Sequence, residues 1–495
     1  MSENKSAVII GAGIGGIATA VFLAKNGYIV NVFEKNSVPG GRCGQIIRDG
    51  YRFDLGATML MMPGIYRNVF QSLGIPLFEN GGIKREDDLY KICFDNNETI
   101  TFTTEEHRMR EQHEQIEPGS FRKSRKYIGE GYDIFKLGIN ELIGRNFDNI
   151  FQFTTLKNTF LLFKLKVYIN NFRYARKFFT HPHLLMAYTF QNIYVGQDPY
   201  QSPALFSMIP AAELTEGSYS PDGGMFAIVE KLMTAAKEAG VLFHFDSPVA
   251  EILTCGPKAE GIRLQNGTRI TSGVIVANAD LPFVYRRLLP DKRKSEKIDR
   301  LKYSCSAVSF HWAIDKTYPQ LSRHNVFLTD DYRAGLRAIF REKSVGSNPC
   351  FYVHAPGKFD NSAAPPGHES LSVVVGSGHI DPLKNQDWEA IKQKTRRAVI
   401  DRLKKFGLED IESHIRSETC ILPADWEDTC NITKGSVFGS LAHNIFQMGY
   451  FRPHNQHSRY KNLFFTGGST QPGNGIPNVL LSAKLTSERI LGKTL

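Results

Sequence analysis

Two glycine-rich segments, one near each end of the chain, constrain the fold most strongly. The first is AVIIGAGIGG at residues 7–16, and the second is FFTGGSTQPGNGIP at residues 464–477 of the 495-residue sequence. Glycine permits tight turns and close backbone approach that other residues hinder. Each segment includes or follows a short apolar run typical of a buried parallel strand. We therefore expect the two ends of the chain to meet at one nucleotide site.

The N-terminal segment has the pattern of a dinucleotide-binding turn. Residues 7–10 predict a strand, and the glycines that follow fit G-x-G-x-x-G. Residues 17–26 predict an amphipathic helix ended by Gly27, whose N-terminal amides would face a pyrophosphate. The residues expected to contact the nucleotide here are Gly11, Gly13, Ile14, Gly15 and Gly16.

An acidic residue follows at the spacing expected for ribose recognition. The strand predicted at residues 29–33 ends at Glu34, about 20 residues after the glycine turn. A carboxylate at this point binds ribose hydroxyls and would repel a 2′-phosphate. We expect Glu34 and the adjacent Lys35 at the adenosine end of the ligand, and an NADP-type ligand is disfavoured.

The residues after Glu34 favour FAD over NAD. Gly41 and Arg42 supply a close-approach turn and a guanidinium suited to a phosphate or a flavin-adjacent group. Gly56, Ala57 and Thr58 would bring backbone near the isoalloxazine ring. The run TMLMM at residues 58–62 follows; its side chains are expected either to line an apolar tunnel or to pack in the core.

The C-terminal segment predicts a second helix terminus at the flavin. Residues 463–466 have a strand pattern, and Pro477 is well placed to open a helix that runs to about residue 490. Its free amides would stabilise negative charge at the flavin N1 and C2 carbonyl. The segment contains no cysteine, so FAD is expected to be noncovalent. The expected contacts are Gly468, Ser469, Gly475, Ile476 and Pro477.

Between the two motifs the chain returns to the nucleotide region. Residues 226–239 predict a helix, and residues 241–245 predict a strand. GVIVANADLP, at residues 273–282, predicts another strand whose end carries Asn278 toward the cofactor. Residues 307–375 alternate between apolar and polar side chains and predict the sheet of a second domain. The domains are therefore expected to be interleaved along the chain.

Positive charge is concentrated in one aromatic segment. The chain has a net charge of +10 and no acidic residue between Asp148 and Asp198. Basic residues beside aromatic ones favour contact with anionic lipid. No uncharged run reaches the roughly 18 residues that span a bilayer, so we expect peripheral membrane association. A lid with a solvated basic face is the alternative, and nucleic-acid binding is disfavoured because no such motif is present. The basic residues are Lys157, Lys164, Lys166, Arg173, Arg176 and Lys177.

Cysteine usage and the N-terminus bear on location. The seven cysteines have no C-x-x-C spacing, which argues against a disulfide framework and a zinc site, so no metal is expected. The start, MSENKSAVII, lacks the basic and apolar regions of a secretion signal. These features predict a cytoplasmic protein bound peripherally to a membrane.

Three blocks spread over the chain resemble carotenoid desaturases of the phytoene desaturase type. They are residues 191–225, residues 422–453 and GGSTQPGNGIPNVLLSAK at residues 467–484. The resemblance implies an α/β fold with a Rossmann-like, glutathione-reductase-like FAD-binding domain of the amine oxidase and carotenoid desaturase group. This domain is interleaved with a substrate-binding sheet domain and a helical membrane-associating lid. The resemblance also places a backbone contact to adenine at Val249. The expected segments are FAD-binding residues 1–100, 206–300 and 421–495, lid residues 101–205 and sheet residues 301–420.

The resemblance implies dehydrogenation of a carotenoid. As a mechanism we expect hydride transfer to flavin N5, followed by proton loss from the adjacent carbon. Glu213, Glu216 and Asp222 are candidate catalytic carboxylates, with structural roles as their alternative. A quinone or oxygen is the expected electron acceptor. The block GGSTQPGNGIP favours 3,4-desaturation of a 1′-hydroxycarotenoid over phytoene desaturation. The sequence is also compatible with a flavin-dependent isomerase or saturase, and with a non-enzymatic lipid-binding protein of the same fold.

Overall fold

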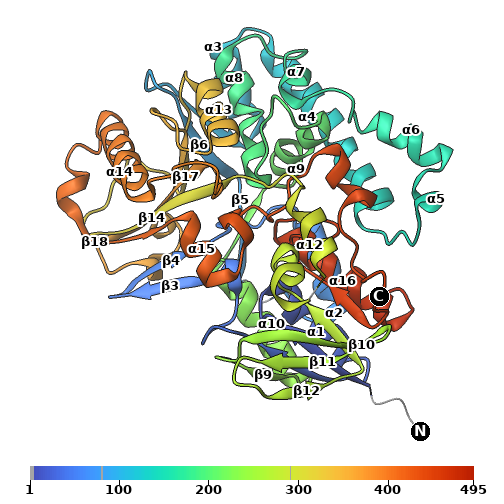
Figure 1. Ribbon diagram of the computed structural model, residues 1–495. Coiled ribbons are helices and arrows are strands. Elements are labelled where there is room, and N and C mark those ends of the chain that lie inside the picture. The colour runs from blue at the N-terminus through green and yellow to red at the C-terminus, as the bar shows by residue number, and fades with distance from the viewer. Residues whose placement is uncertain (1–4, 80–81, 290) are drawn as a thin grey trace.

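The protein is built from two sheet-based regions and a helical region. The computed structural model describes residues 5–79, 82–289 and 291–495. In Figure 1 a five-stranded sheet with its helices lies at the bottom, a second sheet lies above it to the left, and further helices cover the top and right. Strand β1 belongs to the lower sheet, and the C-terminal helix α16 packs against it. Residues far apart in sequence therefore share one region of space.

The lower sheet is parallel and is assembled from three distant parts of the chain. Its order is β19-β13-β1-β2-β9. Ala7 and Ile9 of β1 face one side of the sheet, and Val8 and Ile10 face the other, because side chains alternate along a strand. Both sets are buried, which explains the continuous apolar run in the sequence. The strands are β1 (Ser6–Ile10), β2 (Ile29–Phe33), β9 (Leu242–His244), β13 (Val274–Ala277) and β19 (Leu463–Phe465).

Each face of this sheet has its own cover. Helices pack on the Ala7 face and form one core with it; they are α1 (Ile14–Ala24), α2 (Pro63–Leu73), α10 (Phe226–Glu238) and α16 (Ile476–Leu491). A small antiparallel sheet packs on the Val8 face; its strands are β10 (Val249–Cys255), β11 (Lys258–Leu264) and β12 (Arg269–Thr271). Helix α1 begins at Ile14, three residues before the predicted start, so the glycines at positions 15 and 16 lie inside it.

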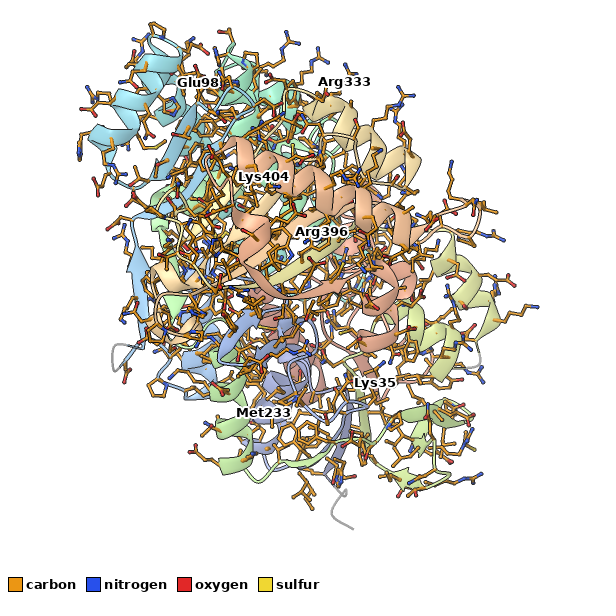
Figure 2. All side chains as sticks on the ribbon, turned by 90° about the vertical axis from the view of Figure 1, so that its left-hand side faces the viewer. Lys35, Glu98, Met233, Arg333, Arg396 and Lys404 are labelled. Carbon is orange, nitrogen blue, oxygen red and sulfur yellow. The ribbon has the colours of Figure 1, made fainter. Side chains whose placement is uncertain are left out.

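The upper sheet has seven strands in the order β18-β14-β17-β16-β15-β6-β7. Val399, Ile400 and Leu403 of α14 (Trp388–Lys405) pack on its apolar face. Figure 2 shows Arg396 and Lys404 of this helix turned toward the viewer. The strands are β6 (Asp88–Cys93), β7 (Thr99–Thr103), β14 (Ser306–Ile314), β15 (His324–Phe327), β16 (Phe351–His354), β17 (Glu369–Ser377) and β18 (Ile415–Ile421).

Strands β6 and β7 correct the predicted extent of this sheet. They lie outside residues 301–420, the range expected for the substrate-binding sheet domain, because β6 pairs in parallel with β15 across a large sequence separation. Such pairing leaves no local signal in the sequence. The β3–β4 hairpin, from Gln45–Arg48 and Tyr51–Asp54, and the β5–β8 pair, from Ile83–Glu86 and Ser218–Pro221, link the two regions.

The helical region is built mostly from residues 106–216. Its helices are α3 (Glu106–Ile116), α4 (Ser120–Gly138), α5 (Ile150–Phe153), α6 (Leu156–Lys164), α7 (Asn171–Ala175), α8 (Pro182–Ala187) and α9 (Met208–Glu216). The charged stretch 105–126 is divided between α3 and α4, because Gly119 adopts a positive φ of 78° between them. In Figure 1, α5 and α6 project to the right, away from both sheets. Within the described residues, no helix has the length and apolar character needed to cross a bilayer.

The lower edge of the upper sheet carries a further helix that reaches toward the nucleotide region. This helix, α15 (Pro423–Cys430), ends at Asn431 in a left-handed conformation. The segment after it returns to the lower sheet through β19. In Figure 1, α15 lies between the two sheet regions.

Candidate functional site

The turn between β1 and α1 leaves no room for side chains. Gly11 has a φ of +98°, and a Cβ on Gly16 would lie 2.2 Å from the carbonyl oxygen of Gly11. The N-cap residue Gly13 caps α1 without a side-chain hydrogen bond, so the first-turn amides have no partner within the helix. A helix terminus of this kind binds phosphate groups through its amides and its dipole.

Glu34 lies at the end of β2, next to this turn. Its Oε2 accepts a hydrogen bond from the Ala12 amide at 2.7 Å, and its Oε1 accepts one from the Asn36 amide at 3.0 Å. The carboxylate is buried yet borders the cavity described below. Its orientation is therefore fixed by backbone donors, while carboxylate lone pairs are still available for ligand hydroxyls.

The last turn of α15 and its C-cap cover the end of β2, where adenosine is expected to bind. Lys35 donates to Asn431 Oδ1 at 3.0 Å and to the carbonyl of Asp428, and Asn36 donates to the carbonyl of Thr429. Figure 2 shows Lys35 below α14, at the level of the lower sheet. Segment 428–431 therefore closes the site from above, and nothing in the local sequence around Lys35 indicates this contact.

Arg42 and Gly56 form the next part of the wall. Arg42 donates to the carbonyl of Val437 at 2.8 Å, and a Cβ on Gly56 would lie 2.2 Å from the carbonyl oxygen of Arg42. Thr58 continues this wall, and its hydroxyl hydrogen-bonds the Tyr352 hydroxyl at 2.7 Å. The segments after β2 and β4 are thus brought against the upper sheet.

The C-terminal glycine segment lies opposite the first. Gly475, with a φ of +86°, is the N-cap of α16, and Ile476 and Pro477 begin that helix. Helices α1 and α16 pack together, and a Cβ on Gly15 would lie 3.1 Å from Val479. The two glycine motifs therefore meet, as the sequence predicted. Asn278 lies between them, with its Nδ2 donating to the carbonyl of Gly11 at 3.2 Å.

One continuous cavity of about 1140 Å³ runs along these groups. All the residues predicted to bind the cofactor border it except Gly16, which instead allows α1 to approach the β1 turn. Ligand pockets usually measure roughly 300–1,000 Å³, so this cavity has room for more than one ligand. Apart from the glycine segments, its wall includes many apolar side chains: methionines 59, 61 and 62, Leu142, Ile143, Phe153, Leu165, Phe190 and Phe206.

Polar atoms at the cavity wall fit a bound dinucleotide. Asn474 Oδ1 and His443 Nδ1 are buried and have no hydrogen-bond partner among the described residues, although both residues border the cavity. Buried polar atoms are rarely left unpaired. The α1 terminus, Glu34 and the α16 terminus would hold the pyrophosphate, ribose and flavin ring respectively.

Three residues that the sequence analysis did not single out shape the flavin end. Arg452 is fully buried and donates to the carbonyls of Gly468 (2.6 Å) and Thr470 (3.0 Å). Burial, reinforced by Arg42, lowers its pKa to about 9. Asp280 borders the cavity, and burial raises the pKa of its carboxyl. Burial also holds the pKa of His443 well below its usual range. In the sequence, the only indication of this role is an arginine within the apolar stretch GYFRP at residues 449–453. Its hydrogen-bond partners lie in a different segment, so the sequence alone does not reveal them.

The three candidate carboxylates lie away from the cavity wall. Glu213 is buried, accepts a hydrogen bond from the Tyr90 hydroxyl at 2.9 Å, and has a pKa raised to about 8 by burial. Glu216 accepts one from Tyr132 at 3.0 Å, and burial raises its pKa. Asp222 is exposed and pairs with Lys84 at 2.9 Å. None of the three borders the cavity.

Comparison with known proteins places the chain in a family. Residues 14–491 match the model of the flavin containing amine oxidoreductases. The zeta-carotene-forming phytoene desaturase of Myxococcus xanthus is 37% identical over 99% of this chain and 94% of its own length. The 4,4′-diapophytoene desaturase of Staphylococcus aureus strain Newman is 32% identical over 98% of each chain.

Solved structures agree on the fold. An oxidoreductase from Methanosarcina mazei superposes with a TM-score of 0.66 at 16% identity, covering 99% of this chain and all of its own. Putrescine oxidase bound to putrescine gives a TM-score of 0.63 at 12% identity, covering 99% of both chains. The chain therefore belongs to the flavin containing amine oxidoreductase family, among the phytoene desaturase-type proteins, and FAD is its cofactor.

Proposed function

We propose that the protein is an FAD-dependent carotenoid desaturase that introduces C=C bonds into an acyclic or hydroxylated carotenoid. The observation that carries this proposal is that one cavity is lined both by the glycine segments and by many large apolar side chains. A carotenoid is a long apolar molecule, and such an environment shields it from water. The names of the relatives, which are phytoene and diapophytoene desaturases, support the same substrate class.

The protein's contribution to catalysis is to position and desolvate the polyene. Bound FAD would supply the hydride-accepting chemistry for an allylic C–H bond, with proton loss from the adjacent carbon. The first-turn amides of α16, beginning at Ile476, and the buried cation of Arg452 supply positive potential at the flavin end. The apolar side chains of the cavity wall exclude water and fix which carbon reaches the cofactor.

Two substrate assignments are compatible with the cavity. The block GGSTQPGNGIP favours 3,4-desaturation of a 1′-hydroxycarotenoid. The relatives' names favour phytoene, since the Myxococcus protein and a Phycomyces blakesleeanus protein 36% identical to this chain are both phytoene desaturases. We therefore propose the hydroxycarotenoid reaction as the first assignment and phytoene desaturation as the second.

An apolar patch on the outside of the helical region supports membrane association. It comprises the exposed side chains of Phe151, Leu156, Phe160, Phe163, Tyr168, Ile445, Phe446 and Phe451. Phe153 joins the part of the patch at residues 151–168 to the part at residues 445–451, because the centroids of the Phe153 and Phe451 rings lie 5.8 Å apart in an edge-to-face arrangement. Large apolar side chains clustered in this way on a surface usually mark an interaction site.

The patch adjoins the cavity and carries positive charge. Segments 150–168 and 445–451 contribute both patch residues and cavity-lining residues, including Phe153, Leu162 and Met448. Lys164 lies 4.9 Å from the centre of the Phe160 ring. A cationic, aromatic surface favours an anionic bilayer, so we propose that the carotenoid enters the cavity from the membrane here. Many aromatics of the predicted basic segment, such as Tyr174 and Phe179, are instead buried in the core.

The experiment is conversion of defined carotenoids. The protein is expressed in bacteria that accumulate either phytoene or a 1-hydroxylated acyclic carotenoid, and pigments are resolved by absorbance and mass. Loss of two hydrogens with a red shift supports desaturation, and the substrate consumed decides between the two assignments. Altered retention at unchanged mass would support an isomerase, and gain of two hydrogens a saturase. No conversion by protein with bound FAD would overturn the proposal.

A further inference from the structure

A hydrogen-bonded chain of side chains leads from the cavity into the upper sheet. The Tyr352 hydroxyl bonds Thr58 Oγ1 at 2.7 Å and His324 Nδ1 at 2.6 Å. Thr58 and Tyr352 both border the cavity, next to the predicted flavin-facing glycine Gly56. His324 is 1% exposed and has no path to solvent along its own surface. The chain therefore connects the reacting end of the cavity to a buried imidazole.

The strand register places a second imidazole beside the first. His324 of β15 is directly opposite His354 of β16, and the two rings stack with centroids 5.0 Å apart. Because side chains alternate along a strand, both histidines lie on the sheet face that carries Tyr352 and Val326, two cavity-lining residues. The histidine pair is thus an extension of the cavity wall.

The same two strands show that an apolar pair would fit this sheet. Phe327, three residues after His324 in β15, pairs with Phe351 of β16 on the opposite face of the sheet. Their rings stack with centroids 4.6 Å apart. The histidine pair leaves three ring nitrogens without hydrogen-bond partners among the described residues: Nε2 of His324 and both nitrogens of His354. Unpaired buried polar atoms are costly. Packing alone therefore does not account for imidazoles at this position.

The surroundings keep both imidazoles neutral and proton-accepting. Burial holds the pKa of His324 and of His354 well below the usual range of histidine. The charged groups that face them contribute: Arg323 acts on both rings, and Arg52 acts on His354. His311, on β14, is also near His354 and is neutral, with a pKa lowered to about 4 by burial. Glu86, the partner of Arg323 at 2.7 Å, and Asp54 face Tyr352 and not the imidazoles.

We propose that Tyr352 is the catalytic proton acceptor of the desaturation and that His324 is the positioning residue that takes the proton of Tyr352. This inference rests on the proposed function. After the allylic carbon has given up its hydride, the adjacent C–H bond breaks and its electron pair forms the new C=C bond. The proton passes to Tyr352 Oη, the hydroxyl proton of Tyr352 passes to His324 Nδ1, and neutral tyrosine is restored.

The resulting imidazolium returns its proton along the same chain. His324 Nε2 is buried and has no partner among the described residues. After product release the proton therefore passes back from Nδ1 through Tyr352 Oη to water that enters the cavity, and the imidazole becomes neutral again. The low basicity of the buried ring favours this return of the proton. The two-electron change remains with the hydride acceptor, and the relay carries one proton per double bond.

The test compares three conservative variants in the FAD-loaded protein. Tyr352→Phe removes one oxygen, and His324→Gln retains an acceptor for the Tyr352 hydroxyl but cannot take a proton. The control is Tyr51→Phe, because Tyr51 also bonds a histidine, His368 at 2.5 Å, but lies outside the cavity lining. Bound FAD is measured by absorbance, and carotenoid conversion is measured as kcat and KM from pH 4 to 9.

We expect Tyr352→Phe and His324→Gln to lower kcat by roughly 100-fold or more, with KM, FAD content and thermal stability near wild type. Wild-type kcat falls at acid pH as His324 becomes protonated, and this acid limb disappears in both variants. Tyr51→Phe retains wild-type kcat and pH profile. Wild-type kcat in Tyr352→Phe, or an unchanged acid limb in both variants, would overturn the relay. Failure of the wild-type protein to desaturate any carotenoid would instead overturn the proposed function.

Discussion

The absence of a Cβ at Gly16 is expected to be required for cofactor binding. A methyl group there would lie 2.2 Å from the Gly11 carbonyl oxygen, a backbone atom that cannot turn away. Replacing Gly16 with alanine must therefore displace α1 from the turn whose amides are expected to hold the pyrophosphate. We expect Gly16→Ala to retain less than about a tenth of the wild-type FAD, measured as the flavin-to-protein absorbance ratio. The control is Gly64→Ala in α2, where an added Cβ meets nothing within 4 Å. Full FAD occupancy in Gly16→Ala would contradict this account of the turn.

Burial of Glu213 makes the free energy of unfolding depend on pH. Its folded pKa of about 8 exceeds the ordinary value of a glutamate. The fold therefore favours the protonated form, and stability is lost as the pH rises through about 8. We expect Glu213→Gln to unfold at a temperature a few °C above wild type at about pH 9 and at nearly the same temperature at about pH 5.

Exposed Asp222 provides the comparison for Glu213. Asp222→Asn should shift the unfolding temperature little at either pH, because its pairing with Lys84 is solvent-exposed. Carotenoid turnover in the same two variants tests their candidate catalytic role. A large loss of turnover in Glu213→Gln with full FAD would favour Glu213 over Tyr352 as the proton acceptor.

Two glycines of helix α4, Gly129 and Gly131, differ in how closely the neighbouring helix packs on them. A Cβ on Gly131 would lie 2.7 Å from both the Ser207 carbonyl oxygen and the Ala211 Cβ, where α4 packs closely on α9, whereas a Cβ on Gly129 meets nothing within 4 Å. We expect Gly131→Ala to destabilise the protein by about 1–3 kcal/mol through overpacking. Gly129→Ala should be neutral or stabilising by up to about 1 kcal/mol. Urea unfolding of both variants provides the measurement, and equal midpoints would show that α4 and α9 separate easily.

Elements also explain what the sequence could predict. The turn from β1 to α1 is predictable because strand, glycines and helix lie within a few contiguous residues, so local rules suffice. The same holds for α16, whose proline and glycine mark its start. The predicted start of α1 is too late because glycines usually disfavour helix, and here packing against Asn278 and α16 prevails. The role of Tyr352 or Arg452 is not predictable, because each depends on partners from distant strands or loops.

At the scale of the whole molecule, the apolar patch and the cavity predict directional binding to a membrane. Leu156 in the patch is 91% exposed and Leu383, on a loop outside it, is 90% exposed, so the two offer a matched pair. Burying one leucine at a lipid surface contributes about 1–2 kcal/mol. We expect Leu156→Ser to weaken flotation with anionic vesicles roughly five- to tenfold, and Leu383→Ser to leave it unchanged. Equal effects of the two substitutions would show that the patch does not face the bilayer.

The parallel sheet that joins β1 to β19 has a consequence for how the protein is made. Roughly 450 residues separate these strands, and at about 5–20 residues per second a ribosome needs of the order of half a minute to more than a minute to add them. Throughout that time the first glycine turn exists without its counterpart on α16. FAD can therefore be captured fully only at the end of translation, and a nascent chain arrested before β19 should not retain the cofactor.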